Sequence, residues 1–216
     1  MTRVKICGIT EPAQALTAAE AGADFIGLVM APSSRQLSPE RARHIAAAVR
    51  QSKASPQVVG VFVNLPPQEV NRIAEYCGLD WVQLSGDEPW EDLHCIDRPV
   101  IRAIGVRSEQ DSDEILAAIR DGREQAGEGF IPLLDCHVEG RYGGSGQSFD
   151  WTVATRVSRQ VPVILAGGLS PANVGEAMRT VSPWGVDVSS GVETDGVKDT
   201  FKIKRFVEVV REEDGR

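Results

Sequence analysis

VKICGIT, at residues 4–10, is a short β-branched run that ends in a cysteine directly before a glycine. The first four residues of this stretch suit a buried strand. Because side chains alternate along a strand, Lys5 and Cys7 share one face, and Val4 and Ile6 share the other. We expect the β-branched face to pack against helices, which leaves Lys5 and Cys7 on the opposite side of the sheet.

Runs of the same kind recur along the chain at regular intervals. Seven more follow the first, and each is short enough to form a single strand. They are FIGLVM (25–30), VVGVFV (58–63), DWVQL (80–84), PVIRAI (99–104), FIPLLD (130–135), VPVILA (161–166) and GVDVSS (185–190).

Start and stop signals for helices lie between these runs. Ser38-Pro39 precedes ERARHIAAAVR, and Pro66-Pro67 precedes QEVNRIAEYC, which is followed by Gly78. Ser108 is expected to begin a helix over EQDSDEILAAIRDG, and Ser170-Pro171 a helix over ANVGEAMRTV. The connection around WEDLHCI is short, and its helix is the least clearly signalled.

Eight strand–helix units without a linker or a compositional break predict one α/β domain over residues 1–216. Eight is the number of units that closes a (β/α)₈ TIM barrel, and this is the fold we expect. The alternative is a doubly wound open sheet. It usually has fewer strands, and the GxGxxG turn expected after its first strand is missing.

The composition narrows the class of protein. A net charge of −8 disfavours binding to nucleic acid or to an anionic membrane surface, and no apolar run is long enough for a membrane span. The stretch MTRVKICG lacks the apolar core of a signal peptide, and the four cysteines form no CxxC pair, so we expect a cytoplasmic protein with free thiols. The three histidines have no metal-ligand spacing, so no metal is expected.

In a TIM barrel the active site lies at the carboxyl ends of the strands. Cys7 ends its strand and is predicted to point into the barrel mouth, where the cation of Lys5 would lower the thiol pKa. The alternative is an inert, buried cysteine. Asp135 shares the interior face with Leu133, and a Gly-rich loop separates it from the next helix, which disfavours a helix cap. Cys7 and Asp135 are thus a candidate base and acid.

Glycine-rich turns follow the last two strands of the predicted barrel, in ILAGGLSPANV (164–174) and VDVSSGVE (186–193). This is where TIM barrels commonly bind phosphate through backbone N–H groups. The loop over residues 143–146 adds further donors. The predicted phosphate-binding residues are Gly144, Ser145, Gly146, Gly167, Gly168, Ser189, Ser190 and Gly191.

Several longer motifs occur together in a fixed order. They are VKICGIT, SSRQLS (33–38), GVFVN (60–64), VQLSGDE (82–88), LLDCHVEGRYGGSGQSFDW (133–151), ILAGGLSPANV and GVDVSSGVE with GVKD (185–199). With these motifs the chain resembles the phosphoribosylanthranilate isomerases of tryptophan biosynthesis over essentially its whole length. The resemblance implies a cofactor-free Amadori rearrangement of a small phosphosugar, N-(5-phosphoribosyl)anthranilate, to the 1-deoxyribulose 5-phosphate derivative.

The resemblance also implies roles for individual residues. Asp135 would be the general acid that protonates the furanose ring oxygen, and Cys7 the general base that removes the proton from C2 of the ribose. Arg35 matches the arginine that recognises the anthranilate carboxylate. Asp187 matches an active-site aspartate whose role is either to bind a substrate hydroxyl or to support the phosphate loop.

Two interior polar residues are less defined. Gln83 faces inward and is expected to contact substrate. Arg102 is placed at an interior position of the fifth strand, where it either senses an anion or pairs with an acidic neighbour.

One position departs from the family pattern. The fourth strand reads VQLSG where the family usually has VQLHG, so Ser85 replaces a histidine. This leaves the acid and the base untouched, but it is the one hint of a barrel that binds phosphosugar without catalysis.

Two other enzyme classes stay open: a Schiff-base aldolase that uses Lys5, and an isomerase of the histidine pathway, in which an aspartate would stand at position 7. A monomer is expected, with a dimer left open.

Overall fold

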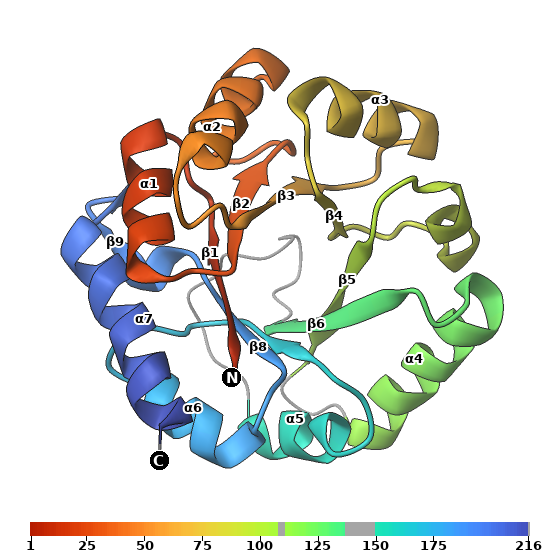
Figure 1. Cartoon of the computed structure of the whole chain (residues 1–216). Helices are drawn as coiled ribbons and strands as arrows, with labels where there is room; N and C mark the ends of the chain where they lie inside the picture. Colours follow the sequence, from red (N-terminus) through yellow and green to blue (C-terminus); the bar gives the residue numbers. More distant parts are fainter. Residues whose placement is uncertain (108–110, 137–149, 216) are drawn as a thin grey trace.

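The computed structural model describes residues 1–107, 111–136 and 150–215, and in it eight parallel strands close into a barrel in chain order. Figure 1 shows the strands at the centre and the helices around them. The strands are β1 (Arg3–Cys7), β2 (Phe25–Val29), β3 (Gln57–Phe62), β4 (Trp81–Leu84), β5 (Val100–Val106), β6 (Phe130–Cys136), β7 (Ile164–Leu165) and β8 (Gly185–Val188). The predicted TIM barrel is confirmed, and the open-sheet alternative is wrong, because β1 pairs with β8.

Helices cover the outside of this barrel. They are α1 (Pro12–Ala21), α2 (Pro39–Gln51), α3 (Pro67–Cys77), η1 (Trp90–Cys95), α4 (Ser112–Ala126), α5 (Trp151–Ser158), α6 (Val174–Val181), η2 (Ser190–Val192) and α7 (Thr200–Asp214). A small antiparallel pair, β9 (Glu193–Thr194) and β10 (Val197–Lys198), lies between η2 and α7. None of the helices in the described part of the chain is long and apolar enough to cross a membrane.

Local chemistry explains where most helices begin and end. The Ser38 hydroxyl accepts a hydrogen bond from the Arg41 backbone N–H, and Pro39 occupies the first turn of α2. Helix α3 ends at Gly78, which has φ of +69°, a conformation that glycine adopts without strain. Both boundaries agree with the sequence signals.

Two predicted helix starts are wrong. Helix α4 begins at Ser112, where the Asp111 carboxylate accepts from the Asp113 N–H, and not at Ser108, which lies outside the described residues. Helix α6 begins at Val174, because Ser170 and Pro171 belong to a preceding turn. The Asn173 side chain closes that turn by accepting from the Ser170 N–H and donating to the Gly168 carbonyl.

The core has two parts. A large apolar layer lies between the strands and the helices and includes Val4 and Ile6. A separate cluster fills the barrel interior and consists of Phe25, Val59, Ile101, Leu133, Ile164 and Ala166. The β-branched face of β1 therefore packs against the helices, as the alternation of its side chains predicts.

The interior cluster overturns the prediction for Arg102. Because Ile101 faces the interior, the neighbouring Arg102 lies on the outer face of β5. There its guanidinium pairs with the buried carboxylate of Glu88, donates to the Glu88 carbonyl over 3.0 Å and lies over the ring of Trp90. Arg102 is therefore no anion sensor of the mouth, and the alternative of an acidic partner is confirmed.

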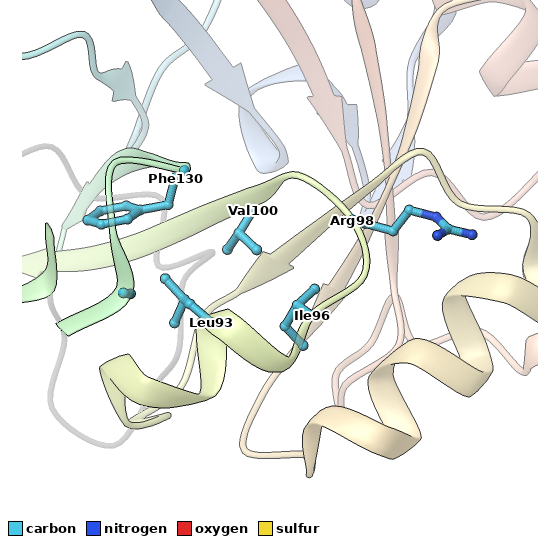
Figure 2. Close-up of a pocket in the computed structure, with 7 residues that line it drawn as sticks. Leu93, Ile96, Arg98, Val100 and Phe130 are labelled. Carbon is cyan, nitrogen blue, oxygen red and sulfur yellow. The ribbon is translucent and has the colours of Figure 1, made fainter.

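The connection between β4 and β5 holds the short 3₁₀ helix η1 in place of an α-helix. A hollow of about 120 Å³ lies beside it. Figure 2 shows that its lining comes from η1 (Leu93), from the following loop (Ile96 and Arg98) and from the first residues of β5 and β6 (Val100 and Phe130). The hollow is thus at the amino end of these strands, opposite the predicted site.

Candidate active site

Cys7, Asp135 and Asp187 come from the carboxyl halves of β1, β6 and β8, and their side chains share the barrel interior with Lys5. Strands β1 and β8 pair with Lys5 opposite Asp187, and the Lys5 ammonium donates to the Asp187 carboxylate over 3.1 Å. The Lys5 side chain is 1% exposed and Asp187 is also buried. An ion pair thus lies below the mouth, next to both predicted catalytic groups.

The Cys7 thiol is buried against β2. Its register partner is Gly27, where an added Cβ would lie 2.9 Å from the Cys7 sulfur. Burial raises the pKa of the Cys7 thiol, and the opposing effect of Lys5 does not cancel this rise. The prediction that Lys5 favours the thiolate is correct in sign, but the pKa of the thiol still lies above its ordinary value.

The Asp135 carboxyl group is also poorly solvated. Burial, reinforced by the negative charge of Asp187, raises the pKa of Asp135 from 3.8 to about 6, against the opposing effects of the Cys136 N–H and Lys5. The Cys136 N–H donates to the Asp135 carboxylate over 2.8 Å. Gly167 lies beside this group, and an added Cβ there would be 3.1 Å from the Asp135 carboxylate oxygen. Asp135 therefore holds a proton at far higher pH than an ordinary aspartate.

Lys5 has the wrong protonation for a Schiff base. Burial lowers the pKa of Lys5, but the charges of Asp187 and Cys7 outweigh burial and raise the pKa overall. An amine nucleophile must lose its proton, and this lysine holds it more firmly than usual. The ion pair with Asp187 and this raised pKa therefore argue against the aldolase alternative.

Arg35 follows β2 in the chain and reaches the mouth beside Gly8. Gly8 has φ of +75°, and an added Cβ there would lie 2.4 Å from Arg35 Cδ and 3.1 Å from Ser189 Oγ. The Arg35 guanidinium donates to Glu193 through Nε and Nη2, each over 2.7 Å. The pKa of Glu193 is lowered, because Arg35 and Lys198 together outweigh the opposing effect of its burial.

The sequence patterns missed Glu193 and Lys198. Glu193 stands directly opposite Lys198 in the β9–β10 pair. The only sequence signal was Asp195-Gly196, a dipeptide typical of a two-residue hairpin turn. It predicts the hairpin but not the contact with Arg35.

Gln83 lies in the interior as predicted and is 6% exposed. Its Nε2 donates to Ser85 Oγ over 3.0 Å, so the residue that replaces the family histidine is a partner of Gln83. Gln83 Oε1 is buried and has no hydrogen-bond partner among the described residues. A carbonyl oxygen in that state is available to a ligand donor.

The predicted phosphate-binding residues fall into two groups. The loops after β7 and β8 touch, because Gly191 packs so closely on the Leu169 carbonyl that an added Cβ would lie 1.9 Å from that oxygen. The structure thus brings together the loop segments of Gly167, Gly168, Ser189, Ser190 and Gly191. Gly144, Ser145 and Gly146 lie outside the described residues.

The described residues contain no group of three or more His, Cys, Asp or Glu side chains that could hold a metal ion. All four cysteines are described, and none is in a disulfide. Free thiols are thus confirmed.

Comparison with known proteins shows which family shares this sequence and fold. The family model described as N-(5'phosphoribosyl)anthranilate (PRA) isomerase matches residues 4–209. An N-(5'-phosphoribosyl)anthranilate isomerase from Dehalococcoides mccartyi is 46% identical over 215 residues, covering 100% of this chain and 98% of that protein.

Solved structures agree with these matches. The phosphoribosyl anthranilate isomerase of Thermotoga maritima has a TM-score of 0.84 at 41% identity, covering 98% of this chain and 100% of that chain. A phosphoribosyl anthranilate isomerase in complex with reduced 1-(o-carboxyphenylamino)-1-deoxyribulose 5-phosphate has a TM-score of 0.81 at 38% identity, with the same coverage. The resemblance carried by the sequence motifs is confirmed, and the chain belongs to the N-(5'-phosphoribosyl)anthranilate isomerase family.

Proposed function

We propose that this chain catalyses the Amadori rearrangement of N-(5'-phosphoribosyl)anthranilate by general acid–base catalysis, with Asp135 as acid and Cys7 as base. The product is 1-(2-carboxyphenylamino)-1-deoxyribulose 5-phosphate, an intermediate of tryptophan biosynthesis. Family membership supports the reaction. The observation that carries the residue roles is the raised pKa of Asp135, about 6, in a mouth that it shares with a buried thiol.

The first step needs an acid at neutral pH. With a pKa of about 6, about a tenth of Asp135 is protonated at pH 7, far more than of an ordinary aspartate. Asp135 donates this proton to the furanose ring oxygen, the bond from that oxygen to C1 breaks, and a C1–nitrogen iminium forms. The iminium makes the hydrogen on C2 acidic.

The second step needs a base beside C2. The Cys7 thiolate takes the C2 proton, the electron pair of the C2–H bond forms a C1–C2 double bond, and the π pair of the iminium returns to nitrogen, which gives a neutral enolamine. The enolamine then loses its hydroxyl proton at C2 and gains a proton at C1, which gives the ketone. Lys5 favours the thiolate, and the positive charge of the iminium adds to this effect while it lasts.

The other mouth residues bind the substrate. Arg35 offers its guanidinium to the anthranilate carboxylate. Gln83, whose Oε1 has no hydrogen-bond partner among the described residues, and Asp187 bind the ribose hydroxyls. The touching loops after β7 and β8, with Gly167, Gly168, Ser189, Ser190 and Gly191, bind the phosphate, and Gly144, Ser145 and Gly146 add donors.

The test is turnover of N-(5'-phosphoribosyl)anthranilate, followed by fluorescence, in the wild type, Cys7→Ser and Asp135→Asn. We expect wild-type turnover and a loss of about 10² or more in kcat for each variant. An active Cys7→Ser enzyme would show that this cysteine only packs. A folded wild type that binds the product without turnover would instead favour the phosphosugar-binding barrel, with Ser85→His as the first reversal to make.

A further inference from the structure

A pair of buried charges lies beside the mouth and supplies neither the acid nor the base of the proposed mechanism. Glu193 on β9 and Lys198 on β10 stand directly opposite each other, and we call them the Glu193–Lys198 pair. The connecting residues, Asp195 and Gly196, have φ of +50° and +78°, as a tight two-residue hairpin turn requires. This turn holds the two side chains side by side.

The pair has contacts of its own besides those with Arg35. The side chains of Glu193 and Lys198 are only 8% and 2% exposed. The Lys198 ammonium donates to the Glu193 carboxylate over 2.5 Å and to the Ser189 carbonyl over 3.0 Å, at the carboxyl end of β8. A buried carboxylate with its own cation and a fixed backbone is a rigid acceptor.

This rigid acceptor contacts Arg35 along one edge of the guanidinium. Nε donates to one Glu193 oxygen and Nη2 to the other, each over 2.7 Å. Arg35 Nη1 has no hydrogen-bond partner in the part of the chain that the structure describes. Because the guanidinium is planar, fixing its Nε and Nη2 edge also fixes the direction of the N–H groups on Nη1. These N–H groups can then bind a second carboxylate.

We propose that Glu193, supported by Lys198, is a positioning residue that orients Arg35 and thereby sets the preference for a substrate with a carboxylate on its aromatic ring. The inference rests on the proposed function, in which Arg35 binds that carboxylate. Glu193 does not act as a competitor that the substrate must displace, because it occupies only one edge of Arg35 and has Lys198 as a second partner. Arg35 and Lys198 are positive and Glu193 is negative, so the three side chains together carry a net positive charge, which attracts an anion.

The test measures binding of two ligands by titration calorimetry. One is reduced 1-(o-carboxyphenylamino)-1-deoxyribulose 5-phosphate, and the other is the phenylamino compound that lacks the carboxylate. We expect the wild type to bind the carboxylated ligand at least about tenfold more tightly. Glu193→Gln should weaken the carboxylated ligand about tenfold and change the other less than about twofold. In an Arg35→Ala background, Glu193→Gln should have no further effect.

Two variants serve as controls. Lys202→Gln removes a 2.7 Å hydrogen bond to the Glu193 carbonyl without touching the carboxylate, and it should leave both affinities unchanged. Should Glu193→Gln not fold, Glu193→Asp keeps the charge but withdraws the carboxylate by one methylene. It should give the same selective loss.

Each other result overturns the inference. Equal weakening of both ligands by Glu193→Gln would show a structural role only, and tighter binding of the carboxylated ligand would show competition. A wild type that binds both ligands equally would remove the assignment of Arg35 itself. Turnover of N-(5'-phosphoribosyl)anthranilate by that same wild type would then show that the reaction stands although the positioning role does not.

Discussion

The carboxyl group of Asp135 is buried where its charged form is poorly solvated, and this raises its pKa from 3.8 to about 6. A folded-state pKa above the unfolded value means that the residue's contribution to stability is highest at low pH and is lost as pH rises through 6. A shift of about two units corresponds to at most about 3 kcal/mol. The ionised acid therefore lowers the free energy of unfolding at the pH where the enzyme works.

Replacing Asp135 with asparagine removes that charge. We expect Asp135→Asn to raise the free energy of unfolding at pH 8 by about 1–3 kcal/mol, with a gain that shrinks toward zero as pH falls to 4. Urea unfolding at pH 8 and at pH 4–5 measures both values. A gain of the same size at each pH would contradict the electrostatic origin, because packing effects do not titrate.

In the proposed mechanism the same pKa sets one limb of the pH–rate profile. There the product of protonated Asp135 and Cys7 thiolate controls kcat/KM, and below pH 6 only the thiolate fraction changes, so we expect kcat/KM to rise with pH. Above about 6 the loss of protonated Asp135 offsets the gain in thiolate, and the profile flattens. In Asp135→Asn the residual kcat/KM should keep rising past pH 6. A break near 6 that persists in this variant would belong to the substrate phosphate instead.

The sequence predicted which strand residues face the barrel interior in some strands but not in all, and it did not predict contacts between distant residues. Alternation along β1 and β6 was enough to place Cys7 and Asp135 on the interior face, because the period of a strand is two. The same reasoning failed for Arg102, since the neighbouring Ile101 occupies the interior. It could not find Glu193, because the contact that singles out Glu193 is with Arg35, 158 residues earlier in the chain.

Among the elements, the connection between β4 and β5 combines apolar packing with a buried ion pair between its Glu88 and Arg102 of β5. Arg102 and Glu88 are 7% and 6% exposed, and the Glu88 carboxylate also accepts the Asn64 and Gly86 N–H groups. Removing one partner of such a pair leaves the other charge buried alone. We expect Arg102→Met to cost about 3 kcal/mol of stability and to leave KM and kcat unchanged, as measured by denaturant unfolding and by turnover.

Because Arg102 lies on the outer face of β5, a rise in KM of tenfold or more would place it at the mouth after all. Arg98→Met is the matched control, since Arg98 lies in the loop that precedes β5 and donates to the Leu79 carbonyl over 3.1 Å. Its loss should cost less than that of Arg102, because no buried carboxylate is left without a partner.

The sequence predicted a helix boundary correctly where a single capping signal was present. Ser38 before a proline marked the start of α2 correctly. At α4 the sequence signal at Ser108 was misleading, because the helix begins at Ser112 and its cap is Asp111. At α6 Ser170 and Pro171 form a turn that Asn173 closes, and only three-dimensional contacts distinguish such a turn from the first turn of a helix.

For the whole molecule, the number of strand–helix units was the decisive sequence signal, because eight units close a ring and fewer leave edges. The pairing of β1 with β8 closes the ring, and a side-chain tie from the last helix to the residues before the first two strands, which no periodicity predicts, accompanies it. Arg211 on α7 donates to the carbonyls of Thr2 and Gly22 and to the carboxylate of Asp24. These partners precede β1 and β2, so the tie lies at the amino end of the barrel, away from the mouth.

Because Arg211 lies at the end of the barrel away from the mouth, we expect its replacement to change stability but not activity. We expect Arg211→Met to lower the free energy of unfolding by about 1–3 kcal/mol, since the Thr2 and Gly22 carbonyls and Asp24 lose a charged donor. Turnover per folded molecule should stay within about twofold of the wild type, because TIM-barrel chemistry is confined to the opposite end. Denaturant unfolding and kcat measured on one preparation give both quantities. A fall in kcat without a loss of stability would mean that the closing tie is coupled to the site, through the β1–β8 seam where Lys5 meets Asp187.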